Sequence, residues 1–455
     1  MMKHQQTELL ATAPIGRLFL RLTIPGIVAQ LVFLLNNVID RMWVGHIENT
    51  GSLALTAVGV CMPIVQTFLA LAAMIGSGAG PRLSILLGED NQEGAERTIG
   101  TSLWFVIVSS VASMALIFLF TEPLIRLFGG SENTMDYAAA YLTTTGWGFI
   151  FLAMSAGMVP LIYAQGMIKE GVLCSIIPLL IHMLLDPVLI FLLDMGITGA
   201  ALAQNIGMLI GTVLILRLLC GKTVTAPLRL RFIRFSAVWL PPCITLGLSA
   251  LAALACESTA LMLYNRALLA LDGDVAVGAM TVFTVVVTII AMMLLGVSTG
   301  AQPIISFNYG AKLHSRVLQA MKVTMWICTA ISTVIWLTVM LFPTAIISAF
   351  TDDANLVAYG ARYAPMFFAL AFLIGANNGV QFILRSLGLA WSSLTLGLLR
   401  RVVLLIPLLM LMPRLFADNG TMAVFMTAPV IELLTLIISL CYYLRIRRQI
   451  IKDTI

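Results

Sequence analysis

Apolar runs of about 20 residues recur along this chain from one end to the other. A helix of that length crosses the ~30 Å hydrocarbon layer of a bilayer. Of the 455 residues, 60% are hydrophobic and 10% are charged, whereas a soluble globular domain has about 25% charged residues. Because so few charges cannot provide the polar surface of a soluble protein, we predict an all-α integral membrane protein.

The breaks between these apolar runs are charged or rich in Gly, Pro and Asn, and they divide the chain into twelve transmembrane helices. An even number of spans places both termini on the same side of the membrane. The expected helices cover residues 18–43, 53–80, 98–120, 138–164, 171–193, 196–219, 238–265, 275–304, 317–341, 357–384, 392–413 and 421–444.

The basic residues are distributed unequally between the two sides of the predicted membrane. The termini and the loops that follow even-numbered spans hold 19 of the 26 Lys and Arg residues. Basic loops stay in the cytoplasm during membrane insertion, so we expect both termini there. The net charge of +5 then reflects topology, and it does not indicate a nucleic-acid partner.

The two halves of the chain share a sequence repeat. Span two ends in GAGP at residues 78–81, and span eight ends in GAQP at residues 300–303, an offset of 222. Gly166 and Gly388 are related by the same offset. Two six-span halves in the same orientation are related by a pseudo-twofold axis along the membrane normal, with substrate and ion sites between or within the lobes.

This repeat predicts three parts. Residues 1–216 form an N-terminal six-helix lobe, residues 217–236 a basic cytoplasmic linker, and residues 237–455 a C-terminal six-helix lobe. The linker contains the alternating sequence RLRFIRF, which is typical of a solvated connector at the membrane interface, although a binding role stays open.

Several segments resemble the multidrug and toxic compound extrusion (MATE) family, specifically its smaller bacterial members. The segments are PGIVAQLVFLLNNVIDRMWVG (25–45), GAGPRLSILLGEDNQEGAERTIG (78–100), DPVLIFLLDMGITGAALAQ (186–204) and STGAQPIISFNYGAK (298–312). The resemblance implies a bacterial inner-membrane antiporter that expels amphipathic, often cationic compounds by alternating access, in exchange for protons or sodium.

The resemblance also implies where the coupling cation binds. In the family it binds in the first lobe, around the residues that match Asp40 and Asp186. This chain departs from the family pattern there, because it has His182 and Gln204 where relatives usually have Asn and Thr. Sodium prefers oxygen ligands, so the imidazole favours protons over sodium.

The spacing of the polar residues within the spans also favours Asp40, His182 and Asp186 as the coupling site. Asp40 shares a helical face with Asn36 and Asn37, and His182 and Asp186 are one turn apart. A buried carboxylate or imidazole can carry a proton when its hydration changes. The alternatives are that Asp40 is an interfacial charge beside Arg41 that points outward, and that His182 only joins helices through a hydrogen bond.

Glu257 lies within span seven, in the hydrocarbon zone, and corresponds to Asp40 in the first half at an offset of 217. A longer loop around Asp272 accounts for the difference of five residues from the offset of 222. A charge at that depth costs at least about 2.5 kcal/mol unless it is paired or neutral. We therefore expect a second proton site or a site for a substrate cation, with a structural hydrogen bond as the alternative.

A further group of amides and one arginine lies within the predicted spans. They are expected to line the substrate cavity, although plain bonding between helices explains them nearly as well. These residues are Gln30, Gln66, Gln302, Asn377, Asn378, Gln381 and Arg385.

Other classes of membrane protein fit the sequence less well. A major facilitator would have a basic signature between spans two and three, where this chain has GEDNQEGAER. A flippase for lipid-linked precursors, of the same superfamily fold, would need a strongly cationic cavity, and the arginines within spans are almost limited to Arg400 and Arg401.

A membrane enzyme would need clustered metal ligands or acid–base residues. The four His residues include no HExxH pair. We therefore expect a transporter and not an enzyme. We also expect it to be monomeric and to hold no metal and no cofactor.

Overall fold

The computed structural model describes residues 8–47, 51–221, 223–351, 353–416 and 419–452, without the side chains of 253–255, 257–259, 414 and 415. These residues form helices and no strand. In chain order the main helices are α2 (Ile15–Gly45), α3 (Gly51–Gly88), α4 (Gln92–Leu119), α5 (Thr121–Leu127), α6 (Glu132–Tyr163), α7 (Ile168–Pro187), η1 (Val188–Leu192), α8 (Gly196–Cys220), η2 (Leu230–Phe232), α9 (Leu240–Asp272), α10 (Asp274–Gly310), α11 (His314–Leu341), α12 (Pro343–Ser348), α13 (Ala354–Phe367), α14 (Leu373–Ser386), α15 (Ala390–Leu398), η3 (Leu399–Leu404), α16 (Leu405–Leu415) and α17 (Gly420–Lys452).

The predicted fold class is confirmed. Within the described residues, ten helical segments are long and apolar enough to cross a membrane. The 33-residue α9 supplies another crossing, and α13 and α14 together supply the twelfth, because a short turn divides that span into two helices of 14 residues each. Backbone groups that leave the helix at such a turn must find partners inside the protein.

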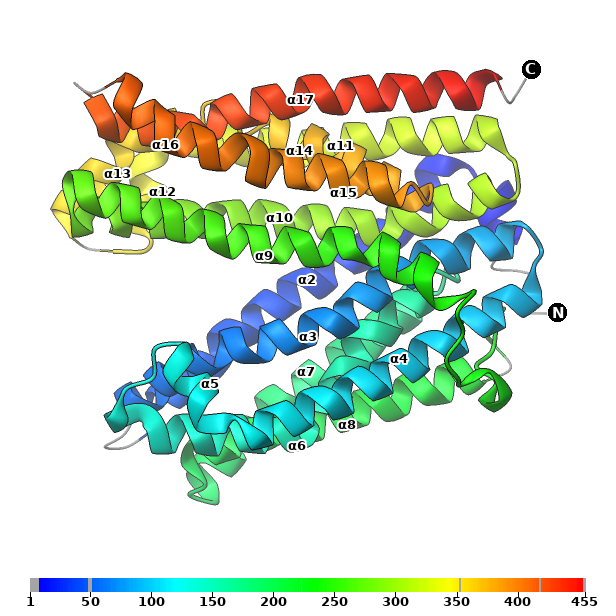
Figure 1. Cartoon of the computed structure of the whole chain (residues 1–455), viewed down its shortest axis with the longest axis horizontal. Helices are drawn as coiled ribbons and strands as arrows, with labels where there is room; N and C mark the ends of the chain where they lie inside the picture. Colours follow the sequence, from blue (N-terminus) through cyan, green and yellow to red (C-terminus); the bar gives the residue numbers. More distant parts are fainter. Residues whose placement is uncertain (1–7, 48–50, 222, 352, 417–418, 453–455) are drawn as a thin grey trace.

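The helices form two groups, from α2 to α8 and from α9 to α17 (Figure 1). Both termini lie at the same end of the molecule, on the right in Figure 1, and we call this end the terminal face. The two groups come together near the terminal face and diverge toward the opposite end. Helix α2 packs on α10, and α3 packs on α9 and α10.

The sequence repeat corresponds to a structural repeat. The Ser84 hydroxyl donates a hydrogen bond of 2.6 Å to the carbonyl of Ala164, and the Ser306 hydroxyl donates one of 2.6 Å to the carbonyl of Ser386. Each donor and each acceptor is separated from its counterpart by 222 residues. The same offset relates the residues with left-handed backbone: Gly166 and Gly388 (φ 79° and 76°), and Asp90 and Lys312 (φ 58° each).

The lobes touch through glycine near the terminal face. A Cβ atom on Gly88 would lie 2.1 Å from the carbonyl oxygen of Phe307, and one on Gly310 would lie 2.1 Å from that of Ile85. Small residues allow membrane helices to approach this closely. The contact between α3 and α10 therefore depends on the absence of side chains at these two positions.

An arginine joins the start of the chain to the C-terminal lobe. Arg316 Nη2 donates to the carbonyls of Leu10 (3.1 Å) and Ala13 (2.7 Å). The Asn308 amide also donates to the Leu10 carbonyl, at 3.0 Å. The segment before α2 is thus fixed to α10 and α11.

The predicted linker is packed against the N-terminal lobe. The backbone N–H of Ala226 donates to Gln165 Oε1 at 2.8 Å, and Gln92 donates to the carbonyl of Thr225 at 2.6 Å. Phe232 is buried, and the Arg97 guanidinium lies 5.1 Å from the centre of its ring. The solvated connector expected from the sequence is therefore partly an ordered part of this lobe, while the predicted boundaries at 216 and 237 stay predictions.

We expect Gly310→Leu to shift the protein away from the arrangement in which the lobes meet at the terminal face, because the new side chain would meet the backbone of α3. Spin labels at Glu89 and Ser315, in a cysteine-free background, would report this shift as longer interspin distances. Gly16→Leu is the control, since nothing lies within 4 Å of a Cβ at Gly16. An unchanged distance distribution in Gly310→Leu would show that the contact does not limit the arrangement.

Candidate functional site

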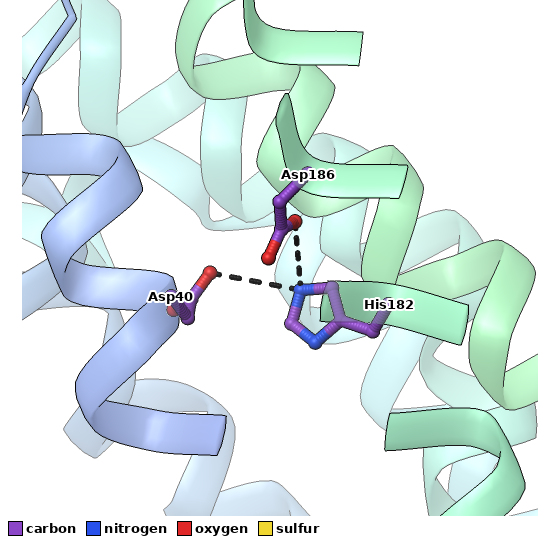
Figure 2. A group of neighbouring side chains, drawn as sticks. All are labelled: Asp40, His182 and Asp186. Carbon is purple, nitrogen blue, oxygen red and sulfur yellow. Dashed lines mark ion pairs between the residues drawn. The ribbon is translucent and has the colours of Figure 1, made fainter. Parts of the chain in front are cut away.

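Helices α2 and α7 bring three titratable side chains together inside the N-terminal lobe (Figure 2). His182 Nε2 lies 3.6 Å from Asp40 Oδ1 and 3.2 Å from Asp186 Oδ1. The side chains of His182, Asp40 and Asp186 are 5%, 10% and 0% exposed. We call this group the Asp–His–Asp cluster.

Local sequence explains how α7 presents its two members. Residues four apart lie on the same face of a helix, so His182 and Asp186 point in one direction. The α-helix ends at Pro187 and continues as the π-helical turn η1. Proline removes a backbone donor at this point, and π-turns within helices are frequent at functional sites.

The cluster leaves polar atoms without hydrogen bonds. Neither carboxylate oxygen of Asp186 and neither ring nitrogen of His182 forms one with the described residues. The 3.2 Å contact of His182 with Asp186 is therefore close enough for an ion pair but poorly aligned for a hydrogen bond. Buried polar groups without partners are costly, and such groups within membrane spans are rare.

The three side chains can be ligands by type and by geometry. Their ligand atoms all lie within 4.8 Å of one another. Two carboxylates and an imidazole can share protons, and they can also coordinate a cation that accepts oxygen and nitrogen ligands.

Tyr141 of α6 also belongs to this region, and the sequence did not reveal it. Its side chain is buried, and it lies close enough to Asp40 and Asp186 for an electrostatic interaction. No spacing along the chain connects position 141 with position 40 or 186, so only the packing of α6 on the other helices brings them together.

The other residues predicted for ion coupling have different surroundings. Asn36 is buried, and its Oδ1 accepts no hydrogen bond from the described residues. Asn37 donates to the carbonyl of Phe33 in its own helix, at 2.8 Å. Gln204 is half-buried, and no described hydrogen bond links it to the cluster. Glu257 lies in α9, but its side chain is outside the described part of the chain.

The burial of Asp40 contradicts the alternative in which it points outward at the interface. With a side chain that is 10% exposed and 3.6 Å from His182, it lies within the lobe. Its role in coupling stays a prediction.

The residues predicted to line the substrate cavity are dispersed. Gln66 is exposed and Gln30 is half-buried. Gln302 donates to the Ser84 hydroxyl at 3.2 Å, across the contact between the lobes. Asn378 donates to the carbonyl of Ile374 within α14, at 2.8 Å. The last three lie on the same helix, where Asn377 and Gln381 are buried and Arg385 is half-buried.

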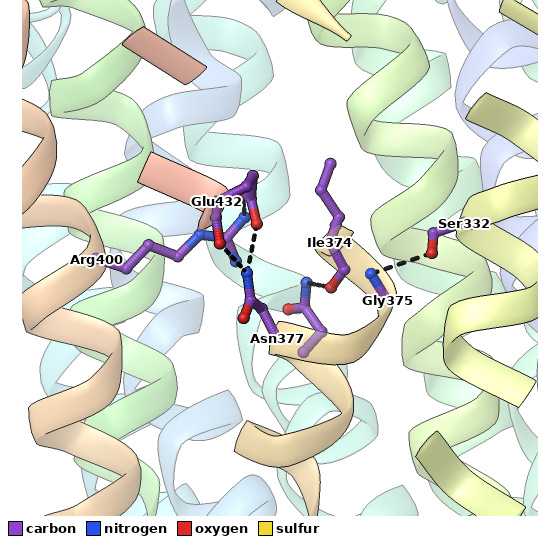
Figure 3. Close-up of polar contacts among 7 residues, drawn as sticks. Ser332, Ile374, Gly375, Asn377, Arg400 and Glu432 are labelled. Carbon is purple, nitrogen blue, oxygen red and sulfur yellow. Dashed lines mark hydrogen bonds and ion pairs between the residues drawn. The ribbon is translucent and has the colours of Figure 1, made fainter. Parts of the chain in front are cut away.

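A second buried charged group lies in the C-terminal lobe, and the sequence analysis missed its acid (Figure 3). The Arg400 guanidinium pairs through Nη2 with Glu432 Oε1, and Asn377 Nδ2 donates to Glu432 Oε2 at 2.7 Å and to the Glu432 carbonyl at 3.0 Å. Glu432 is the one acid in its span, within PVIELL at 429–434. That isolation was the available signal, since an acid at membrane depth needs a partner.

This pair borders a cavity of about 180 Å³ within the C-terminal lobe. None of the seven residues predicted for the substrate cavity lines it. Its wall is mostly apolar and aromatic, and it is formed by Ala260, Leu261, Tyr264, Met280, Thr284, Val287, Phe367, Phe368, Ala371, Ile374, Arg400, Arg401, Leu405, Ala428, Pro429, Ile431 and Glu432.

Comparison with known protein families identifies the family of this chain. The MatE family model matches residues 25–188 and 250–411, more than half of the chain and most of both lobes. The chain belongs to the MatE family. Members of this family are membrane transporters, so the match favours transport over the alternative of a membrane enzyme.

Individual relatives are distant but match over nearly their whole length. A protein of Shewanella oneidensis named "FAD transporter" is 24% identical over 96% of this chain and 95% of its own. The multidrug export protein MepA of Staphylococcus saprophyticus is 22% identical over 92% of each chain. A solved structure of a multidrug resistance MATE family transporter, in an outward-facing conformation, has a TM-score of 0.89 with 20% identity and covers 99% of both chains.

We expect Glu432→Gln to destabilise the protein by about 3 kcal/mol, because it leaves the half-buried Arg400 guanidinium without a counter-charge. The double variant Arg400→Met/Glu432→Gln should recover most of this loss, since no uncompensated charge remains. Unfolding of the detergent-solubilised protein by denaturant would measure both. Equal losses in the single and double variants would mean that the ion pair itself stabilises the lobe.

Proposed function

We propose that this protein exports small amphipathic, often cationic compounds across the bacterial inner membrane in exchange for protons. The observation that carries the proposal is the buried Asp–His–Asp cluster, which joins two helices of the N-terminal lobe. The family match supports transport, and the name of MepA supports multidrug export.

The chemistry of the cluster favours protons over sodium. Sodium requires hard oxygen ligands, whereas His182 offers nitrogen at a distance of 3.2 to 3.6 Å from the two carboxylates. A protonated imidazole would also repel a metal cation. An unperturbed histidine changes its charge between pH 5 and 8, which is the range in which a proton gradient acts on a bacterial membrane protein.

Helix α2 can connect the Asp–His–Asp cluster to the contact between the two lobes. Asp40 lies toward one end of α2, and Thr23 and Gly26 lie against α10 of the other lobe. Pro25 interrupts the hydrogen-bond ladder of α2 beside this contact. A change in charge at Asp40 that moves α2 would therefore also change the contact between the lobes, as alternating access requires.

The orientation in the membrane follows from the basic loops. The positive-inside rule places the terminal face in the cytoplasm, with both termini. The helices of the two lobes come together near that face and diverge toward the other (Figure 1), so in this arrangement the lobes would be apart on the outer side. The presence of both lobes in one chain supports function as a monomer.

We expect Asp40→Asn to abolish export and to leave membrane insertion unchanged, because the amide keeps the shape of the side chain but cannot exchange a proton. Ethidium accumulation in cells that express the variant at the wild-type level measures this. Asp136→Asn, which changes an exposed acid of α6, is the matched control and should export normally. Normal export by Asp40→Asn would remove Asp40 from the mechanism.

In inverted vesicles, a pH gradient that is acidic inside the vesicle should drive the uptake of ethidium, and a sodium gradient should not. His182→Asn restores an oxygen ligand to the site, so we expect weaker dependence on the pH gradient or a new response to sodium. Uptake by the wild-type protein that is driven by a sodium gradient at fixed pH, with no response to protons, would falsify proton coupling.

A further inference from the structure

The cavity of the C-terminal lobe combines an aromatic wall with an ion pair whose acid is buried. Tyr264, Phe367 and Phe368 contribute rings to the wall. The ring centres of Tyr264 and Phe367 are 6.3 Å apart, and those of Phe367 and Phe368 are 5.0 Å apart, with nearly perpendicular planes in both pairs. Walls of this kind accept a planar ring by stacking and edge contacts.

The volume of the cavity indicates the size of the group that it can hold. A dry protein cavity of about 150 Å³ is known to hold one benzene molecule. A cavity of about 180 Å³ therefore suits a compound with one ring or two fused rings.

At the border of the cavity, the acid of the ion pair is held in place by two partners. Glu432 is 7% exposed, and both carboxylate oxygens are engaged, one by Arg400 and the other by Asn377. Asn377 also binds the backbone carbonyl of Glu432, at 3.0 Å. The carboxylate is therefore fixed in place, with little capacity for a second cation.

Arg400 has capacity that Glu432 lacks. A guanidinium carries five N–H donors in a planar fork, and the contact with Glu432 uses Nη2. The Arg400 side chain is 20% exposed, against 9% for that of Glu432, and it lines the cavity. An acid in the cavity can thus join Arg400 without displacing Glu432, and charge-assisted bonds of this type are about twice as strong as neutral ones.

Stability alone does not account for the pair. Replacing a buried ion pair by apolar residues of similar volume is often neutral or stabilising. Charges within spans are rare, and they usually mark the path of a substrate or an ion.

We propose that this cavity binds an aromatic acid of one or two rings, with the acid group on Arg400 and the ring between Tyr264, Phe367 and Phe368. Glu432 and Asn377 are positioning residues that hold the guanidinium at the cavity. The inference rests on the proposed export activity and gives it a substrate class of opposite charge to the cationic compounds expected from the sequence.

Three indoles that differ mainly in charge test the proposal: indole-3-acetate (anion), tryptophol (neutral) and tryptamine (cation). Calorimetric titration of the purified full chain in detergent, at pH 7, should show indole-3-acetate binding about tenfold more tightly than tryptophol, which corresponds to one hydrogen bond between charged groups. Tryptamine should bind most weakly. Tighter binding of tryptamine, or equal binding of all three, overturns the proposal.

Arg400→Met/Glu432→Gln should bind indole-3-acetate and tryptophol equally, because the guanidinium is gone while no buried charge is left unpaired. Gel filtration and circular dichroism establish that this variant is folded. Arg126→Met/Glu132→Gln removes an exposed ion pair of the other lobe and should keep the tenfold preference. A preference that survives loss of Arg400 overturns the assignment to this cavity.

Binding and transport fail separately in this design. Loss of pH-driven ethidium uptake together with an intact preference for indole-3-acetate contradicts the proton-coupled export and leaves the binding site standing. Normal uptake without any preference among the indoles contradicts the binding site alone.

Discussion

A charge inside a bilayer must be paired or neutralised, and this requirement organises both lobes. The Asp–His–Asp cluster places three titratable groups among α2, α6 and α7, where no described hydrogen bond satisfies Asp186 or His182. In the other lobe, Glu432 meets the same requirement through Arg400 and Asn377. The N-terminal lobe thus holds titratable groups that lack hydrogen-bond partners among the described residues. In the C-terminal lobe, both carboxylate oxygens of Glu432 have a partner.

This difference separates what each lobe can do. A buried carboxylate that lacks partners responds strongly to a proton, because protonation removes its charge and with it the cost of burying that charge. A fixed ion pair with spare donors responds to a ligand, because its geometry is already set before the ligand arrives. Helix α2 connects the two, since it carries Asp40 and also packs on α10 of the C-terminal lobe.

Much of the fold could be predicted from the sequence, because lipid imposes one length and one composition on every span. The offset of 222 was also visible, and the bonds of Ser84 and Ser306 show that it reflects equal geometry in both halves. His182 and Asp186 were predicted as a pair because helix periodicity connects residues four apart.

Contacts between helices that are far apart in the sequence were harder to predict. Tyr141 approaches Asp40 only through packing, and no periodicity within a helix reports that approach. Glu432 is an isolated acid in an apolar span, and no pattern along the chain connects it with its partner Arg400, 32 residues earlier. Of the residues predicted for the substrate cavity, Asn377 is the one that binds Glu432.

The tie between Leu10 and Arg316 has a consequence for how the chain is made. The carbonyl of Leu10 is synthesised 306 residues before the guanidinium that binds it. During synthesis, the N-terminal segment must therefore wait through eight membrane insertions before it can dock. A ribosome that stalls before Arg316 would leave this segment unanchored, so its docking marks a chain in which the first two spans of the second half have already been inserted.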